Sequence, residues 1–178
     1  MKVRETEAQI SGVVPLLLAL YYRCVSGKPL PVNSPSPLCN NIHSCKHHHV
    51  YKQVLSQVAR LNMTAQDLFN TYLTCQGAPF STHLDDICNP NDTYFPAFAV
   101  NRTSTEKEIM VALYKVFAFL NASLGNITRD QHKLNPKAEN LRNQLINTTK
   151  TTRGLISNLT CLLCSTKYNV SQVDVTYG

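Results

Sequence analysis

Three observations predict an all-α fold for this 178-residue chain, with three long helices of a four-helix bundle that runs up-up-down-down. Apolar residues recur at helical spacing at about 44–76, 105–124 and 136–167, and no stretch alternates as a strand would. About 28 residues separate the first two helices, enough to run the length of a helix and return, whereas about ten join the second and third. The first two helices should therefore be parallel and the third antiparallel to both.

The amino terminus, residues 1–27, is predicted to be a secretory signal peptide. Basic residues precede an apolar run at Val13–Tyr22, and small side chains at 25–27 supply a cleavage site after Gly27. The run is about 10 residues long, half of what a membrane span needs, and no later segment looks apolar enough to span. We therefore expect a secreted product, a single helical domain at 28–178, with no insertion into a membrane.

Four prolines between residues 28 and 38 predict an extended arm ahead of the first helix. The helix itself, at about 44–76, follows from apolar residues spaced three and four apart. Gly77 and Pro79 should end it, because glycine just past a helix and proline soon after are typical stop signals. The apolar positions are Val50, Val54, Val58, Leu61, Leu68, Phe69, Tyr72 and Leu73.

A capping box predicts the start of the second helix, because Thr105 and Glu108 can each bond the other's backbone N–H. The connection before it, 77–104, is rich in proline and asparagine and should have little regular structure. The apolar stripe of the helix continues to Leu124, and Gly125 should end it.

Asn135 as N-cap and Pro136 as first helical residue should open the third helix, which is expected to end near Lys167. Its stripe comprises Leu141, Leu145, Ile156, Leu159, Leu162 and Leu163. A second long crossover should then begin at about 165–178, so the fourth helix is expected to be absent from this chain.

Eight Asn-x-Ser/Thr acceptor sites occur in the sequence, where composition would give about three by chance. Because an attached glycan must stay in water, these sites mark surface positions and a chain made in the secretory pathway. They favour a function carried by surfaces, as in a ligand, a carrier or a receptor fragment. The predicted glycosylation sites are Asn62, Asn91, Asn101, Asn121, Asn126, Asn147, Asn158 and Asn169.

Charge and motifs argue against nucleic-acid binding, metal binding and catalysis. The formal net charge of +6 is spread along the chain without a run of Lys or Arg. The triplet His47–His49 cannot converge on one ion, since successive helical side chains point about 100° apart. No acid–base pair, Ser-His-Asp set or phosphate loop is recognisable, so we expect neither an enzyme nor a cofactor.

Cys24 leaves with the leader, and the six remaining cysteines are expected to form disulfides in an oxidising compartment. A zinc site is the less favoured alternative for the closely spaced pairs. Because the third helix should end where the first begins, Cys39 and Cys45 lie within reach of Cys161 and Cys164, which share one helix face.

Five stretches carry a family resemblance: Ser123–Gln131, Leu134–Pro136, Arg153–Leu155, Cys161–Cys164 and Val173–Gly178. Together with the leader they closely resemble the leukemia inhibitory factor group of the interleukin-6 family of long-chain helical cytokines. The resemblance implies a secreted cytokine and growth factor that bridges a specific leukemia inhibitory factor receptor and the signal-transducing receptor subunit shared within the family.

The resemblance also implies how the cysteines pair. Cys88 resembles the family cysteine that bonds to the fourth helix, which family members have and this chain lacks. Cys75 matches no family position, so a bridge to Cys88 and a free or intermolecular thiol both stay open. The implied disulfides are Cys39–Cys164 and Cys45–Cys161.

By resemblance, the shared subunit contacts one face of the first and third helices. The positions are spaced so that each set forms one stripe, and Gly154 with Ser157 should let a partner backbone approach closely. Lys150 stands where the family has an acidic residue. The specific receptor is bound mainly by the fourth helix, with loop positions such as Pro79. The shared-subunit positions are Gln53, Ser56, Arg60, Lys150, Thr151, Gly154 and Ser157.

Two alternatives stay beside this interpretation. One is a truncated, poorly active or antagonist-like form of such a cytokine, because three helices leave an apolar groove where the fourth would lie. The other is a secreted helical lipid-binding protein, which six cysteines and amphipathic helices also permit, although such a protein would lack the family motifs.

Overall fold

The computed structural model describes residues 38, 39, 45, 47–78, 82, 96, 98, 100–165, 168, 170 and 173–175. Within them are three helices, α2 (His47–Gln76), α4 (Glu106–Leu134) and α5 (Glu139–Leu163), and no strand. The predicted all-α class is confirmed. The leader lies outside the described residues, as do most of the arm and most of the connection before α4.

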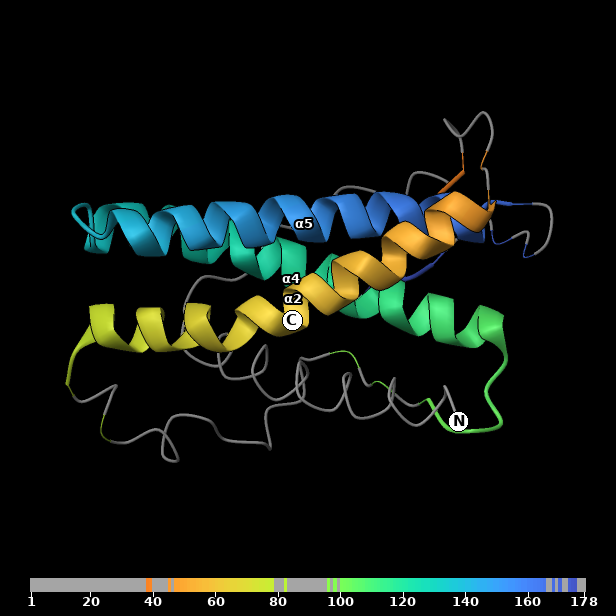
Figure 1. Ribbon diagram of the computed structural model, residues 1–178, viewed down its shortest axis with the longest axis horizontal. Helices are drawn as coiled ribbons and strands as arrows, with labels where there is room; N and C mark the ends of the chain where they lie inside the picture. Colours follow the sequence, from red (N-terminus) through yellow and green to blue (C-terminus); the bar gives the residue numbers. More distant parts are fainter. Residues whose placement is uncertain are drawn as a thin grey trace.

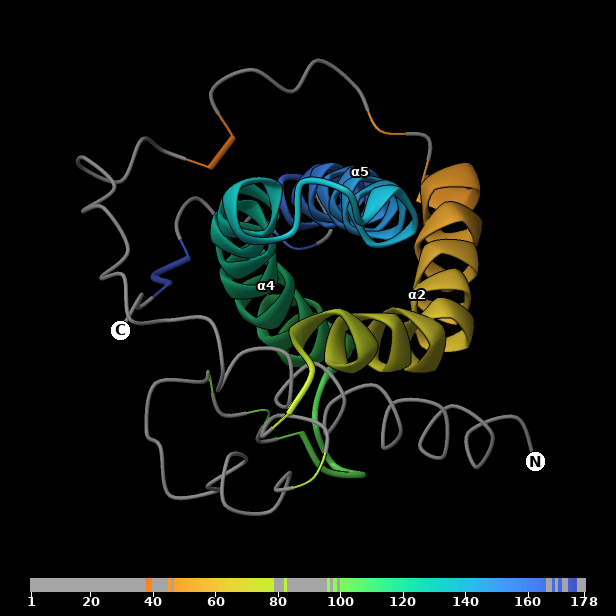
Figure 2. The ribbon, with the colours of Figure 1, turned by 90° about the vertical axis from the view of Figure 1, so that its left-hand side faces the viewer.

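The three helices run up, up and down. α2 and α4 point the same way, and α5 returns antiparallel to both (Figure 1). α5 packs against each of the other two and lies between them when the bundle is viewed from its end (Figure 2). The loop lengths therefore predicted the order and direction of these helices correctly.

The core forms around α5, whose leucine stripe is the most deeply buried part of the bundle. Leu145, Leu155, Leu159 and Leu163 are 0% exposed, and each contributes about 1.5 to 3 kcal/mol on burial. α2 and α4 meet this stripe with apolar residues at helical spacing, including Leu61 and Leu68 of α2 and Val116, Phe117 and Leu120 of α4.

Two of the buried threonines that interrupt the leucine stripe of α5 have their hydroxyls hydrogen-bonded to the helix backbone. The Thr149 hydroxyl donates to the Leu145 carbonyl at 2.8 Å, and the Thr152 hydroxyl donates to the Thr148 carbonyl at 2.9 Å. A hydroxyl satisfied by its own helix can be buried at little cost. These small side chains therefore fit the core where α5 faces its neighbours.

Gly77 ends α2 as predicted. Its φ of 68° lies in the left-handed region, and its N–H donates to the Leu73 carbonyl at 3.1 Å, which satisfies one of the last free carbonyls of the helix. Pro79, the second stop signal, lies outside the described residues.

The start of α4 was predicted correctly, but its end was wrong. The Thr105 hydroxyl accepts from the Glu108 N–H at 3.3 Å, and Glu108 Oε2 accepts from the Thr105 N–H at 2.7 Å. The helix does not stop at Gly125 and continues to Leu134. A glycine inside a helix costs about 1 kcal/mol, which burial of the following Ile127, 1% exposed, outweighs.

α4 also corrects the expectation that no later segment is apolar enough to span a membrane. By length and composition alone it is long and apolar enough, with a mean hydropathy of 1.3. These values describe the most apolar 18-residue segment of α4, and 44% of that segment is buried inside the protein. The apolar residues are explained by packing against α5, as in the core helix of a soluble bundle.

The predicted start and end of the third helix were both wrong. Asn135 caps the end of α4 instead: its N–H donates to the Gln131 carbonyl at 2.9 Å, and α5 begins only at Glu139. Pro136 therefore lies in the turn between the helices. α5 ends at Leu163, short of Lys167, where the Val170 N–H donates back to the Leu163 carbonyl at 3.0 Å.

Candidate functional site

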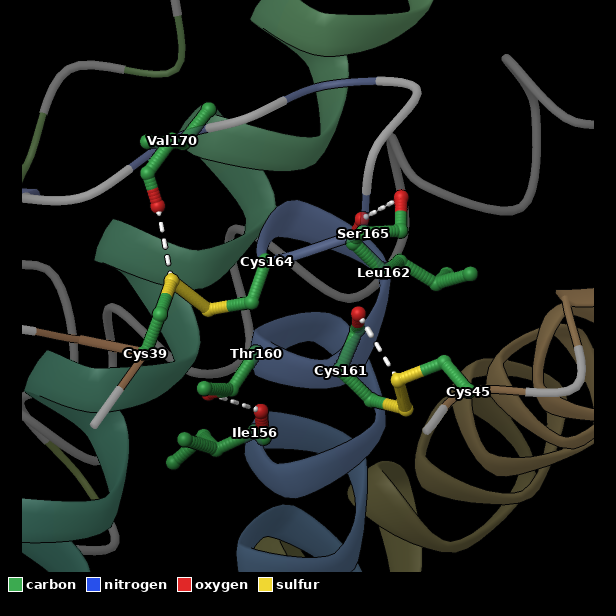
Figure 3. Close-up of a disulfide and its surroundings, with 9 residues drawn as sticks. All are labelled: Cys39, Cys45, Ile156, Thr160, Cys161, Leu162, Cys164, Ser165 and Val170. Carbon is green, nitrogen blue, oxygen red and sulfur yellow. Dashed lines mark hydrogen bonds between the residues drawn. A yellow bond between two sulfur atoms is a disulfide. The ribbon is translucent and has the colours of Figure 1, made fainter. Parts of the chain in front are cut away.

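Two disulfides close one end of the bundle, where α2 begins and α5 ends. Cys39 bonds Cys164 and Cys45 bonds Cys161, with Cα–Cα distances of 5.4 and 5.8 Å (Figure 3). Both distances fall in the usual disulfide range. The bridges are those that the family resemblance implies, and they attach the chain before α2 to the last turn of α5.

Cys75, near the end of α2, is a free thiol and half-buried. Of the predicted alternatives for Cys75, the structure therefore has the unbridged thiol and no bond to Cys88 within the chain. An intermolecular bond stays a prediction, and Cys24 and Cys88 themselves lie outside the described residues. Within the described part of the chain, no group of three or more His, Cys, Asp or Glu side chains could hold a metal ion.

The positions expected to contact a receptor lie on adjacent helices. On α2, Gln53, Ser56 and Arg60 are exposed. On α5, Lys150 and Ser157 are exposed, whereas Thr151 and Gly154 are half-buried. Because α2 packs directly on α5, the two sets lie on neighbouring elements. We call their combined surface the α2/α5 face.

A shallow groove joins the two helices on this face. Arg60 from α2 and Thr151 from α5, both predicted site residues, line it together with Asp67, Gln144 and Asn147. Its volume is about 140 Å³, too small for an organic ligand but suited to one or two side chains of a partner. At its edge Gln144 Oε1 is buried and has no hydrogen-bond partner among the described residues.

Gly154 has a neighbour that the sequence analysis missed. A Cβ at this position would lie 2.8 Å from Gln57 Nε2, and Gln57 Oε1 accepts from Asn158 Nδ2 at 3.0 Å. The space left by the missing side chain of Gly154 is therefore filled by α2 of the same chain. A partner backbone could approach Gly154 closely only if Gln57 moved.

Helical spacing alone places Gln57 beside the predicted site residues of α2, although the prediction did not include it. It lies four residues after Gln53, on the same side of α2, but its partner Asn158 is 101 residues away. Only the register of α2 against α5 brings the two amides together. Pro79, the loop position expected to help bind the specific receptor, lies outside the described residues.

A family profile described as the LIF / OSM family matches residues 49–178, about three quarters of the chain. The chain belongs to the LIF/OSM family. Members of this family are helical cytokines of the interleukin-6 type, are secreted, are not enzymes and bind receptors of the shared signal-transducing class. The helical architecture described above is the one this family uses.

Six predicted glycosylation sites of this LIF/OSM-family chain fall on described residues, and they differ in exposure. Asn101 lies in a turn and Asn147 on α5, and both are exposed. The other four are half-buried: Asn62, Asn121, Asn126 and Asn158. Asn91 and Asn169 lie outside the described residues.

A second groove of this LIF/OSM chain lies at the disulfide end, between the starts of α2 and α4. Its volume is about 460 Å³, and its lining includes Tyr51 and Leu55 of α2, which are 42% and 46% exposed. Leu162 and Tyr168 also line it. The lining is mostly apolar, which is typical of a packing surface.

Among the described residues, two acid–base groups have shifted pKa values, and neither lies on the α2/α5 face. Hydrogen bonds from Thr105 lower the pKa of Glu108 at the start of α4. Burial raises the pKa of Tyr114, and a hydrogen bond with Thr160 opposes that shift. Both shifts follow from helix capping and helix packing, so they need no catalytic explanation.

Proposed function

We propose that this chain is a secreted cytokine that signals by bridging two receptors. The α2/α5 face would bind the signal-transducing subunit shared within the interleukin-6 family. The leukemia inhibitory factor receptor would be the specific partner, contacted partly by loop positions such as Pro79. Family membership supports the class of function. The groove on the α2/α5 face supports the proposed location of the receptor site.

The main support for a receptor site here is the groove that Arg60 of α2 and Thr151 of α5 line together. Arginine is over-represented among residues that dominate binding energy. Arg60 and Lys150 give the face two exposed cations, which suits a partner that presents carboxylates or carbonyl oxygens.

The unpaired acceptor beside the groove also favours a protein partner. A buried acceptor without a hydrogen bond costs about 1 to 3 kcal/mol, and Gln144 Oε1 is such an atom among the described residues. If the Gln144 amide turned toward the groove, a donor supplied by a bound partner would remove that cost in the complex. Association would therefore gain from this position as well as from Arg60.

Secretion and glycosylation belong to the same proposal. Residues 1–27 would be removed as a signal peptide, and the predicted Asn-x-Ser/Thr sites would carry glycans. Treating the secreted protein with an N-glycosidase should lower its apparent mass, and amino-terminal sequencing should begin near Lys28. An unchanged mass would contradict the proposed processing.

Charge reversal at Arg60 tests the receptor site directly. Arg60→Glu should weaken binding to the ectodomain of the shared subunit by at least about tenfold, the size expected for a dominant contact. Lys133→Glu, which reverses an exposed charge at the far end of α4, is the matched control and should bind normally. Affinities would be measured by surface plasmon resonance on protein with both disulfides intact.

Gly154→Arg is the second test of the same face. The added side chain must displace the flexible end of Gln57 and would project over the groove without removing a core contact. Binding to the shared subunit should fall by a similar factor. If both variants fold and bind like the unmodified protein, the shared subunit does not use the α2/α5 face.

A further inference from the structure

The amide of Asn158 has two uses that compete for the same space. Its Nδ2 atom donates to Gln57 Oε1 at 3.0 Å across the α2/α5 contact. The same nitrogen is the atom that receives a glycan, because Asn158, Leu159 and Thr160 form an acceptor sequence. A sugar on Nδ2 therefore has to share the space that Gln57 occupies.

The end of the Gln57 side chain lies close to both Gly154 and Asn158 of α5. Its Nε2 atom lies where a Cβ of Gly154 would be, 2.8 Å from that position. Its Oε1 atom is held by Asn158, and the contact between the two amides is partly buried. A pyranose ring is far larger than the hydrogen atom it replaces, so a ring attached on the side of Nδ2 that faces Gln57 would displace this side chain from over Gly154.

The rest of the acceptor sequence is also engaged in helix packing. Leu159 is 0% exposed, and the Thr160 hydroxyl donates to the Ile156 carbonyl at 2.8 Å. Tyr114 of α4 shares a further hydrogen bond with Thr160. Oligosaccharide transfer needs an accessible acceptor, so it has to occur before α5 folds. Folding of α5 and glycosylation of Asn158 therefore compete.

Asn101 provides a contrast within the same chain. It is exposed in the turn before α4, and its Oδ1 atom accepts from the Thr103 N–H at 2.9 Å. No helix–helix contact uses its Nδ2 atom among the bonds described, so a glycan there leaves the bundle unchanged. The conflict between modification and packing is a property of Asn158.

We propose that Asn158 is a control site whose modification switches off the α2/α5 face. The bare amide holds Gln57 over Gly154, and the face is complete. A glycan on Nδ2 displaces Gln57 and covers the face, so the glycosylated form does not bind the shared receptor subunit. The receptor half of this inference rests on the proposed function, whereas the displacement of Gln57 does not.

The modification itself is an ordinary group transfer. The anomeric carbon of a lipid-pyrophosphate-linked oligosaccharide bonds to Nδ2, and the bond from that carbon to the phosphate oxygen breaks. The lipid pyrophosphate leaves with the electron pair, and Nδ2 loses one of its two protons. No oxidant or reductant is involved.

The test compares two fractions of one secreted preparation. Protein from mammalian cells is passed over the immobilised ectodomain of the shared subunit, and bound and unbound fractions are collected. N-glycosidase in heavy-oxygen water converts each glycosylated asparagine to labelled aspartate, which mass spectrometry counts site by site. Occupancy at Asn158 should be at least tenfold lower in the bound fraction, and occupancy at Asn101 should be equal in both.

Two outcomes would overturn the inference. One is equal occupancy of Asn158 in bound and unbound protein. The other is a lack of glycan at Asn158 in both fractions and in the intracellular protein, since a site that is never modified controls nothing. Thr160→Val removes the acceptor sequence but keeps the Asn158 amide and its bond to Gln57, so it should increase the bound share.

A readout without the receptor separates this inference from the proposed function. Protein glycosylated at Asn158 should unfold at a lower denaturant concentration than Thr160→Val with all other sites intact, because Thr160→Val blocks the glycan but keeps the Asn158 amide that bonds Gln57. Equal midpoints would mean that Gln57 is not displaced. If none of the secreted protein binds the receptor subunit, the proposed function fails, while the unfolding midpoints still test whether a glycan at Asn158 displaces Gln57.

Discussion

The two ends of the bundle are closed by different chemistry. At one end, where α2 begins and α5 ends, Cys39–Cys164 and Cys45–Cys161 are covalent bonds. At the other, Gln131 of α4 is 4% exposed, and its Oε1 atom accepts from Gln76 Nε2 at 2.8 Å and from Asn135 Nδ2 at 2.7 Å. We call these the disulfide end and the amide end.

The difference shows two ways to hold helix ends together. A disulfide stabilises mainly by restricting the unfolded chain, more so when it closes a long loop, and these bridges span 125 and 116 residues. The amide contacts act only in the folded state and depend on every partner being present. Loss of one disulfide should therefore cost more than loss of the amide cluster.

Removal of a bridge at the disulfide end should have the largest effect. Replacing Cys45 and Cys161 together by serine should lower the free energy of unfolding by about 2 to 5 kcal/mol and reduce secretion accordingly. Denaturant unfolding and the amount secreted from cells would measure both effects. Cys75→Ser is the control and should be nearly neutral, since Cys75 is a free thiol; equal secretion of all variants would contradict the comparison.

Removal of the shared acceptor at the amide end should have an intermediate effect. Gln131→Ala leaves Gln76 and Asn135 without their acceptor, which should cost about 1 to 3 kcal/mol in denaturant unfolding. Gln66→Ala removes an exposed amide contact to Asn70 on α2 and should stay within about 0.5 kcal/mol. If Gln131→Ala costs no more than Gln66→Ala, the amide end is not held by this cluster.

The capping box gives the smallest effect and makes part of the stability at the disulfide end depend on pH. Thr105→Ala should cost about 1 kcal/mol at neutral pH. Because hydrogen bonds lower the pKa of Glu108 from its ordinary value of 4.5, its contribution is complete above that pH. This contribution of Glu108 to stability is lost as the pH falls through its lowered pKa in the folded protein.

Glu108→Gln separates the titration from the bonding. Glutamine can still accept from the Thr105 N–H, so the helix should remain capped while its stability no longer responds to this group below pH 4.5. Urea unfolding at several pH values would measure the slope. An identical slope in both proteins would show that Glu108 does not titrate as its hydrogen bonds imply.

Sequence periodicity predicted the helices because each one buries a stripe, and loop lengths predicted their directions. The errors occurred at residues with two possible structural roles. Gly125 is a common stop signal, but it lies inside a helix because Ile127 beyond it is buried. Asn135 is a good N-cap by type, but it caps the end of α4 through Gln131.

The candidate site was predictable only in part. The exposed positions on α2 and α5 came from the family resemblance and from helical spacing. The contact between Gln57 and Asn158 depends on how far α2 is shifted along α5, and no local pattern encodes that shift. The same holds for the buried acceptor of Gln144, whose surroundings come from both helices.

The position of the disulfide partners along the chain also sets an order of events during synthesis. Cys39 and Cys45 enter the oxidising compartment more than 100 residues ahead of Cys164 and Cys161, and Cys75 arrives in between. Early thiols can therefore form temporary bonds with one another before their native partners exist. Cys161 and Cys164 then arrive within one turn of α5, and the correct pairing differs from the crossed one by only three residues. We therefore expect the native bridges to be selected once α5 has coiled, so that exchange between disulfides matters more for this chain than the first oxidation of its thiols.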